Sequence, residues 1–458
     1  MPKQPESTFE PRRARIEAGR ALRQSVPRSS HGAWKAAKKG RDALALLERS
    51  GEGRLAELLP LRYARMLQSP FAYLRGSAAV MAFDLAATPA TGIRVQACGD
   101  CHLMNFGAFA TPEGHLVFDI NDFDETLAAP WEWDLKRLAA SVVVAGRYRG
   151  FPERRCLDAV RATVGTYREM VAEYADAPTL EVWYTRIDAG DLIELGAASG
   201  VGKLPSAPAA RMHAHAGAQL LPKLTRVVAG SRRIRDDPPL IEHMPRHTDY
   251  AARVREAVRR YRQSLPDERR ALLDRFHLVD IARKVAGVGS VGTRCAVALF
   301  MADDDDPLFL QFKEARPSVL EPHAGRSRYR NHGERVVVGQ RLMQSASDLF
   351  LGWSRTGRPA FDFYVRQLRD MKTSVHLDAL PVRGFVSYAR FCGRALARAH
   401  AKAGDAARIA GYLGRNDAFD RAIQKFARTY ADQTERDHAA LVKAVRAGRI
   451  NAAADASP

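Results

Sequence analysis

The sequence lacks any long apolar run, and this limits the kind of protein it can be. Its longest such stretch, near residues 138–146, contains Ser141 and is far shorter than the roughly 20 apolar residues of a membrane-spanning helix. Residues 1–23 also lack the apolar core of a secretory signal. We therefore expect no membrane span and a cytoplasmic location.

Cysteine is scarce, with five residues in a chain of 458. An odd, scattered set predicts no disulfide framework and fits a reducing compartment. Cys98 and Cys101 form the only Cys-x-x-Cys pair in the sequence. Without a second pair at ligand spacing, they predict neither a zinc site nor a redox centre.

Acidic residues are outnumbered by basic ones. The sequence has 52 Asp and Glu against 71 Lys and Arg, which leaves a net charge of +19 and a pI near 10.0. Such a surface attracts anions, so nucleic acid, a phosphorylated substrate and ATP are all compatible partners. The basic residues are mostly arginines spread along the chain, without a dense tract interleaved with aromatic residues. Nucleic acid is therefore not the favoured partner.

The chain is long enough for two or three lobes, and its patterns divide it accordingly. Residues 1–68 form a basic, helix-forming arm, whose first 30 or so residues are poor in apolar side chains and are expected to be disordered. We assign residues 69–276 to a mainly helical large lobe, 277–372 to a small β-rich lobe and 373–458 to helices that return to the large lobe. The irregular stretch 190–245 is expected to be an insertion in the large lobe.

Residues that can carry chemistry concentrate in the stretch 95–141. Apolar, strand-like residues lead into Asp100 and Asp119, so both carboxylates are expected where a strand gives way to a loop. Asn105 follows the first aspartate by five positions, and the second aspartate follows the asparagine by fourteen. An aspartate that accepts a hydroxyl proton, an asparagine five residues later and a second, metal-binding aspartate form the catalytic half of a protein kinase. Turns alone explain single members of this set but do not require its spacing.

This interpretation assigns a role to each residue. Asp100 is the expected general base, and Asn105, Asp119 and Asp122 are the expected ligands of Mg²⁺. His102 is placed in the catalytic group, either in the scaffold of the loop or in contact with the substrate. The carboxylates after Asp119 add charge near the metal ions; besides the ligand role given to Asp122, outer ligands or a solvated turn stay open for Asp122, Asp124 and Glu125.

The second pattern is a glycine turn between strand-like runs. Gly287, Gly289 and Gly292 separate two such runs, and a third run delivers Lys313. The dinucleotide-binding version of this motif requires a helix directly after the glycines, where this chain has β-branched and apolar residues. Glycines that let the backbone approach phosphates, with a lysine on the third strand, form the nucleotide-binding half of a kinase. We therefore expect the three glycines, Ser290 and Lys313 to bind ATP.

Other residues support the two patterns. Asp134 opens a helical pattern and is expected to accept backbone hydrogen bonds from the catalytic loop, and Arg75 is expected either in an ion pair or in contact with substrate or phosphate. Glu334, at the start of another helical pattern, is a weakly indicated partner for the lysine. The four aspartates 303–306 predict a hairpin turn, and a hinge is expected at 368–371.

The motifs resemble those of known families. The run CGDCH through Asn105, the strand end LVFD and the helix start WDL are similar to the Brenner-type motif of aminoglycoside phosphotransferases and choline kinases, with Cys98 where those families usually have a histidine. The whole chain also resembles an uncharacterised bacterial family, domain of unknown function twenty-two fifty-two. That resemblance is carried by FAYLRGSAAVM, GDCHLMNFG, FDINDFDE, PWEWDLKRLAAS, KVAGVGSVGTR, LQFKEA and YVRQLRDMK.

The order of the two patterns is unusual, because the catalytic pattern precedes the glycine turn and kinases have the reverse. We therefore expect an α+β, two-lobed, protein-kinase-like fold that is circularly permuted. The expected function is ATP- and Mg²⁺-dependent phosphotransfer to an unidentified hydroxyl-bearing acceptor. Two alternatives stay open: nucleotidyl transfer on the same fold, and a non-catalytic, basic nucleic-acid-binding or regulatory protein with a kinase-like shell.

Overall fold

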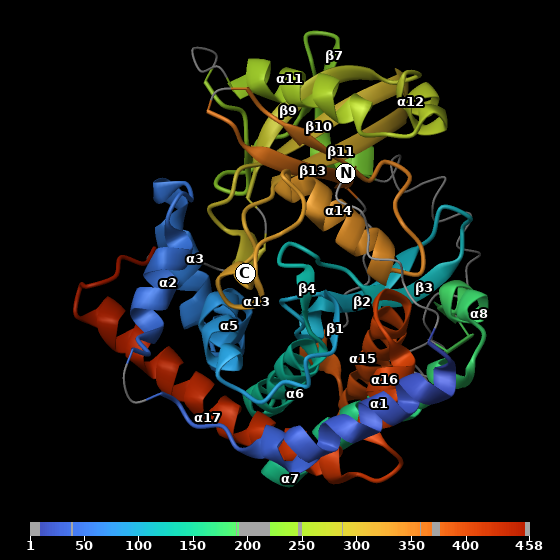
Figure 1. The fold of residues 1–458 in the computed structure, drawn as a ribbon. Coiled ribbons are helices and arrows are strands. Elements are labelled where there is room, and N and C mark those ends of the chain that lie inside the picture. Colours follow the sequence, from blue (N-terminus) through green and yellow to red (C-terminus); the bar gives the residue numbers. More distant parts are fainter. Residues whose placement is uncertain are drawn as a thin grey trace.

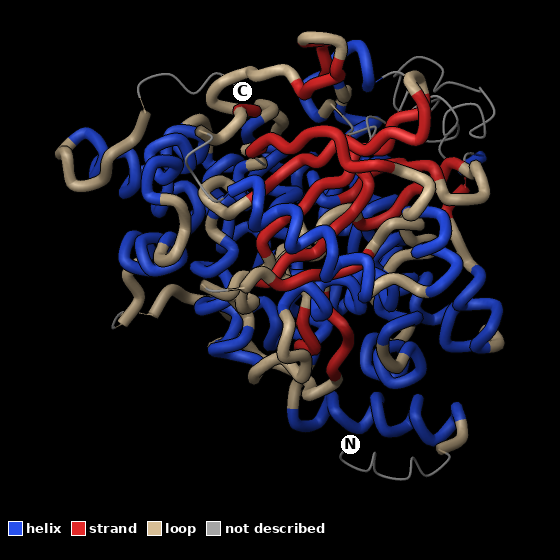
Figure 2. Tube along the Cα trace, turned by 90° about the horizontal axis from the view of Figure 1, so that it is seen from above, coloured by secondary structure: helices blue, strands red, loops and turns tan. Residues whose placement is uncertain are grey.

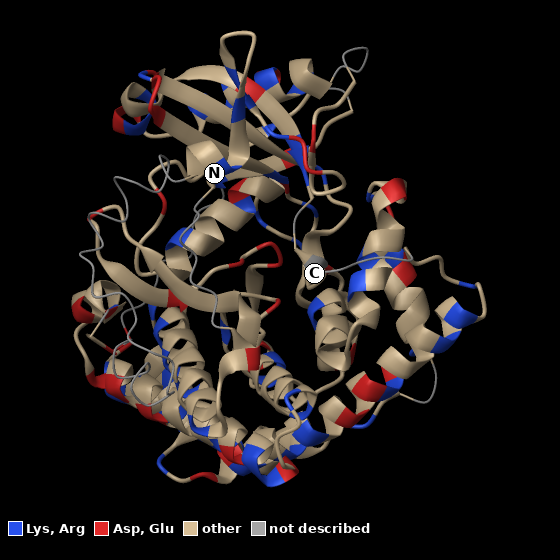
Figure 3. Cartoon of the chain, turned by 180° about the vertical axis from the view of Figure 1, so that it is seen from behind, with Lys and Arg blue, Asp and Glu red and all other residues tan. Residues whose placement is uncertain are grey.

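The structure is a computed structural model that describes residues 10–37, 40–188, 190–191, 220–245, 250–285, 287–357, 359–368 and 376–453. It consists of a large helical lobe and a smaller lobe built on one β-sheet (Figure 1). Within the described ranges, no helix combines the length and the apolar character needed to cross a membrane. Lys and Arg are distributed over both lobes with Asp and Glu among them (Figure 3), in keeping with the spread of arginines along the sequence.

The helical lobe takes segments from both ends of the described chain. Its earlier elements are α1 (Arg12–Ser25), η1 (Arg28–Gly32), α2 (Ala43–Gly51), η2 (Ala56–Leu58), α3 (Leu59–Leu67), α4 (Pro70–Gly76), α5 (Ala78–Ala86), β1 (Arg94–Ala97), η3 (Leu103–Asn105), β2 (Phe106–Ala110), β3 (Leu116–Ile120), β4 (Leu127–Pro130), α6 (Trp131–Tyr148), α7 (Glu153–Asp176), α8 (Thr179–Tyr184) and β5 (Ile187–Asp188). Its later elements are η5 (Leu377–Ala379), α15 (Val382–Ala403), α16 (Ala406–Leu413) and α17 (Ala418–Arg446).

The core of this lobe forms around α6, which is buried from Trp131 to Gly146. A helix that is buried on all sides needs neighbours on all sides. Helices α7, α15 and α17 provide them, and one apolar cluster runs through all four helices. Strand β1 pairs with β4, and β2 pairs with β3, so the residues between these strands are held at the edge of this core.

The sheet lobe contains β6 (Thr225–Val228), β7 (Ser231–Ile234), β8 (Ile241–Glu242), α11 (Tyr250–Gln263), α12 (Asp267–Leu273), β9 (His277–Lys284), η4 (Val288–Ser290), β10 (Cys295–Asp303), β11 (Asp306–Glu314), α14 (His332–Met343), β12 (Gly352–Arg355) and β13 (Asp362–Gln367). The short helix α13 (Glu321–Ala324), between β11 and α14 in the chain, packs on α5 and β4 of the helical lobe. Its six-stranded antiparallel sheet has the order β12-β13-β11-β10-β9-β8. Seen from above, these strands lie side by side (Figure 2). The expected arrangement of strand, glycine turn, strand, hairpin turn at 303–306 and lysine-bearing strand is confirmed.

Side chains alternate between the two faces of β11, so this strand contributes both to an apolar core and to the lining of the cavity. Leu310 and Phe312 pack with α11 on one face of the sheet. Side chains of neighbouring strand residues point to opposite faces, so Gln311 and Lys313 lie on the other face. Both of these polar side chains line the cavity between the lobes.

The lobe boundary differs from the expected one. Helices α11 and α12 pack on the six-stranded sheet, whereas the sequence placed residues 249–276 in the large lobe. The reason is that the apolar stripe of α11 has no helix to meet and covers the sheet instead, as Val254, Ala257 and Tyr261 do. Of the expected insertion, residues 192–219 lie outside the described part, as do residues 369–371 of the expected hinge.

The N-terminal arm is also more ordered than expected from its composition. Residues 12–25 form helix α1, which packs along α16. A Cβ on Gly19 would lie 2.0 Å from the carbonyl oxygen of Arg408, and one on Gly411 would lie 2.1 Å from that of Ile16. The two helices therefore approach at their backbones, and close packing at glycines replaces the missing apolar side chains.

Because of this contact, we expect the usual preference of helices for alanine over glycine to be reversed at Gly19. Alanine normally stabilises a helix over glycine by up to about 1 kcal/mol. Gly19→Ala should instead lower the free energy of unfolding by about 1–3 kcal/mol, because the added methyl group forces α1 away from α16. Gly165→Ala is the matched control, since a Cβ there meets its nearest neighbour at an ordinary 3.6 Å. Urea denaturation of both variants tests this, and equal effects would contradict the close packing.

Candidate active site

The loop between β1 and β2 is held in place by the first turn of α6. The backbone N–H groups of Cys98 and Gly99 donate to the two carboxylate oxygens of Asp134, at 2.6 and 2.9 Å. The expected role of Asp134 is confirmed. Gly99 has φ +85°, and a Cβ there would lie 2.3 Å from the carbonyl oxygen of Glu125, so this turn requires glycine.

Asp100 follows this turn and faces the cavity with its side chain 20% exposed. Arg137 Nε donates to its Oδ1 at 2.6 Å, and His102 Nε2 lies 3.9 Å from its Oδ2. Burial raises the pKa of Asp100 to about 7, although Arg137 opposes the shift. Burial also lowers the pKa of His102 well below its ordinary value, so this imidazole is neutral. The site thus contains a carboxylate poised to exchange a proton near neutral pH.

Asn105 and Asp122 lie beside this carboxylate. The Asn105 side chain donates to the backbone oxygen of Asp100, and its own backbone oxygen accepts from Asn121 at 2.7 Å. This second bond places the turn after β3 next to the catalytic loop. Asp122 lines the cavity and forms no ion pair with any described residue. Carboxylate and amide oxygens of this kind are suitable ligands for a hard divalent cation.

Asp119 does not share this position. Its carboxylate is fully buried, accepts from Arg398 at 2.7 and 2.9 Å, and accepts from the backbone and the hydroxyl of Ser345 at 2.8 Å. This placement corrects the expected metal role. Asp119 lies within β3 and points into the core, so the carboxylate that reaches the cavity is Asp122, three residues later.

Lys313 reaches the same cavity from the sheet lobe. Its ammonium group donates to Asp124 Oδ2 at 2.8 Å, which corrects the expected pairing with Glu334. Tyr364 also donates to this carboxylate, at 2.6 Å. Burial would lower the pKa of Lys313, but Asp122 and Asp124 raise it above its ordinary value, so the ammonium stays charged.

The glycine turn closes the cavity on the sheet-lobe side. A Cβ on Gly289 would lie 3.4 Å from the backbone oxygen of Arg75 and 3.9 Å from Asp100 Oδ2, so the turn reaches the catalytic loop. Ser290 Oγ donates to Asp124 at 2.9 Å. Arg54, in the segment between α2 and η2, donates to the backbone oxygens of Gly289 at 3.0 Å and Val291 at 2.7 Å.

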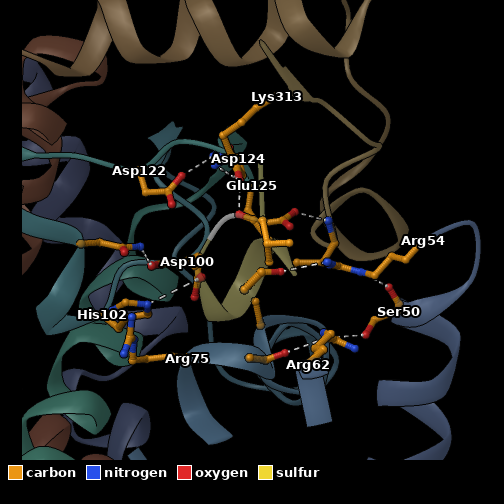
Figure 4. A pocket seen from close by; sticks show the side chains of 18 of the residues that line it. Ser50, Arg54, Arg62, Arg75, Asp100, His102, Asp122, Asp124, Glu125 and Lys313 are labelled. Carbon is orange, nitrogen blue, oxygen red and sulfur yellow. Dashed lines mark hydrogen bonds and ion pairs between the residues drawn. The ribbon is translucent and has the colours of Figure 1, made fainter. Parts of the chain in front are cut away.

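These elements enclose a cavity of about 320 Å³ (Figure 4). The helical lobe contributes Asp100, His102, Asn105, Asp122, Asp124 and Glu125. The sheet lobe contributes Gly287, Gly289, Ser290, Gln311, Lys313 and Arg366. The segment from α2 to α4 contributes Ser50, Arg54, Arg62 and Arg75.

The structure therefore brings together nearly all the expected site residues, and Asp119 is the main exception. Gly292 adopts φ +87° and accepts a hydrogen bond from Leu55, so it shapes the turn and does not line the cavity. Sequence reasoning missed Arg54 and Arg62, for which no motif gave a signal, whereas contact with substrate or phosphate was one of the two roles expected for Arg75. It also missed Gln311, which the two-residue period from Lys313 indicates.

No metal cluster is evident among the described residues: no three His, Cys, Asp or Glu side chains converge as ligands. Magnesium typically takes only one or two protein carboxylates and completes its shell with phosphate and water. Asn105 and Asp122 fit that requirement. Cys98 and Cys101 are buried free thiols.

Comparison with protein families matches residues 54–444 to DUF2252, described as an uncharacterised protein conserved in bacteria. No curated protein and no solved structure matches the chain. The matched range includes the sheet lobe, most of the helical lobe and every residue that lines the cavity except Ser50.

The two aspartates of the turn region should differ in their effect on stability. Asp119→Asn leaves Arg398 buried without a counter-charge, and breaking a buried pair in this way costs about 3–5 kcal/mol. Asp122→Asn should cost less than about 1 kcal/mol, because that carboxylate has no ion pair to lose. Urea denaturation measures both, and equal losses would contradict the structural role of Asp119.

Proposed function

The chain belongs to the DUF2252 family, and from its cavity we propose that it is an ATP- and Mg²⁺-dependent phosphotransferase with a kinase-like, circularly permuted fold. The observation that carries this proposal is the meeting of two distant motifs in one cavity. Asp100, Asn105 and Asp122 come from the helical lobe, and the glycine turn and Lys313 come from the sheet lobe. The first set would supply the general base and the metal ligands of phosphoryl transfer, and the second would supply the groups that bind the phosphates.

The permutation is supported by the path of the chain. Helices before and after the sheet lobe pack into one helical core, as α6 and α7 do with α15 and α17. The sheet lobe with its glycine turn is thus placed between two halves of the helical lobe. Joining the same parts in another order leaves the contacts between them unchanged, because packing depends on position in space and not on connectivity.

The proposed reaction uses the chain's own groups in defined roles. Asp100 accepts the proton of the acceptor hydroxyl while that oxygen bonds to the γ-phosphorus and the bond from this phosphorus to the β,γ-bridging oxygen breaks, releasing ADP. Arg137 keeps the accepting carboxylate oriented through its hydrogen bond. Lys313 binds phosphate oxygens, and its pairing with Asp124 holds the ammonium group in the cavity.

Asn105 and Asp122 would hold the metal ion in this proposal. Bound Mg²⁺ would neutralise negative charge on the triphosphate oxygens. The turn glycines would let the backbone approach the phosphates, as the absence of side chains at Gly287 and Gly289 allows.

ATP with Mg²⁺ should stabilise the folded chain, because its ligands converge only in the native state. At about 100 times the dissociation constant, bound nucleotide adds about 2.7 kcal/mol to the free energy of unfolding. Thermal unfolding with and without millimolar ATP–Mg²⁺ measures this effect. An unchanged midpoint in nucleotide-free protein would count against the proposal.

Asp100→Asn and Asp122→Asn should fail in different ways. The first should lower ATP turnover about 10²–10⁴-fold through loss of the base, with ATP affinity retained. The second should weaken ATP binding in the presence of Mg²⁺ only, since a neutral amide is a poorer ligand for a hard cation. Calorimetry with and without Mg²⁺ separates the two, and Asp304→Asn in the exposed hairpin turn is the matched control. If Asp100→Asn alone lost Mg²⁺-dependent ATP binding, the roles assigned to Asp100 and Asp122 would be wrong.

A further inference from the structure

One wall of the cavity carries buried positive charge without an obvious partner. Arg62, on α3, is only 1% exposed. Its Nη2 donates to Ser50 Oγ at 3.0 Å and to the backbone oxygen of Gly76 at 2.9 Å, whereas Nε and Nη1 are buried and without a partner. The side chain lines the cavity and forms no ion pair with any carboxylate that the structure describes.

Arg75, at the end of α4, is half-buried and likewise has no counter-ion among the described residues. It lines the same cavity, its Nε is buried without a partner, and its side chain forms no hydrogen bond or ion pair within the described chain. One of its two expected roles, an ion pair with a carboxylate, is therefore not realised. The negative charges that act on it are those of Asp100 and Asp122, which line the same cavity.

Such an arrangement is costly unless something else supplies negative charge. Burial lowers the pKa of both Arg62 and Arg75. The charged neighbours of Arg62 include two further cations, Arg54 and Arg316. A buried guanidinium without a counter-ion is strongly unfavourable in a folded protein. An anionic ligand would remove that penalty.

The first turn of α5 adds to the same wall. Ala78 and Ala79, its first two residues, line the cavity next to Arg75. The N–H groups that begin a helix have no partners inside it, and they carry a partial positive charge that favours phosphate. Two guanidinium groups and a helix N-terminus thus face one space. We call this set, Arg62, Arg75 and the first turn of α5, the arginine wall.

We propose that the arginine wall binds a phosphate group of the acceptor, so that the substrate is a phosphorylated compound with a free hydroxyl group. The two positive charges match a phosphate dianion better than a carboxylate, which has one charge. This inference rests on the proposed phosphotransferase function and identifies its substrate class.

The geometry places the wall next to the catalytic base. The backbone oxygen of Arg75 and Oδ2 of Asp100 both lie within 4 Å of the position that a Cβ on Gly289 would take. Lys313, which would hold the nucleotide, enters from the sheet lobe and is paired with Asp124. A small phosphorylated acceptor on the wall would therefore present its hydroxyl to Asp100 from the side away from the lysine, as the labelled side chains in Figure 4 are arranged.

Calorimetry with two probes tests the inference on the full chain. Inorganic phosphate should bind in the presence of saturating AMP-PNP–Mg²⁺, because the two occupy different sites. Arg75→Gln should weaken phosphate binding by at least about tenfold and leave AMP-PNP–Mg²⁺ affinity unchanged. Lys313→Met should weaken AMP-PNP–Mg²⁺ binding and leave phosphate affinity unchanged. Arg49→Gln, an exposed arginine of the same helical arm, should change neither affinity.

Further variants separate binding from folding and phosphate from other anions. Arg75→Lys retains the charge and should retain most of the phosphate affinity, and unliganded melting temperatures identify any variant that does not fold. Acetate should bind much more weakly than phosphate; equal affinity would overturn the assignment of phosphate.

The remaining outcomes distinguish this inference from the proposed function. Absence of phosphate binding would overturn the inference. Displacement of phosphate by AMP-PNP–Mg²⁺ would also overturn it and would assign the arginines to the nucleotide, as an inverted nucleotide in nucleotidyl transfer requires. Arg75-dependent phosphate binding without any AMP-PNP–Mg²⁺ binding would refute the phosphotransferase function and leave the phosphate site standing.

Discussion

The carboxylate of Asp124 is the interaction on which the cavity depends. It accepts hydrogen bonds from Lys313, Tyr364 and Ser290, all of which belong to the sheet lobe, while the residue itself belongs to the helical lobe. On the other side of the same turn, the buried Arg335 of α14 donates to the backbone oxygens of Asp124 and Thr126. The two lobes are thus joined by charged hydrogen bonds at the cavity itself, so the relative position of their functional groups is set where chemistry would take place.

The cavity is lined by side chains of both charges, and two of its arginines, one buried and one half-buried, are not neutralised within the described chain. The helical lobe contributes both signs, with Asp100 and Asp122 as well as Arg62 and Arg75 lining the cavity. The two arginines have no ion-pair partner among the described residues. Burying unpaired charges lowers stability, and a fold retains such groups most readily where a ligand pairs with them. A triphosphate with its metal on one side and an anionic acceptor on the other would satisfy both sets.

Local patterns predicted much of this arrangement. The strand, glycine turn and strand around Gly289 follow from alternation and turn chemistry, and Lys313 on the third strand follows from the same period. Asp134 could be assigned to backbone hydrogen bonding because an acidic residue in the first turn of a helix favours N–H groups nearby. The spacing of the acidic residues did not predict the position of Asp119 correctly. Strand β3 is buried on both faces, so the Asp119 side chain points into the core and not into the cavity.

The sequence alone determined which residue types are present, the order of the elements and the faces of the strands, because these depend on interactions between near neighbours in the chain. Only the tertiary structure decided that Asp122 and not Asp119 faces the cavity, and that Asp124 pairs with Lys313. It also decided that Arg62 lines the same cavity. Each of those outcomes depends on segments that lie far apart in the chain. Their meeting is set by packing of the two lobes, which no local period encodes.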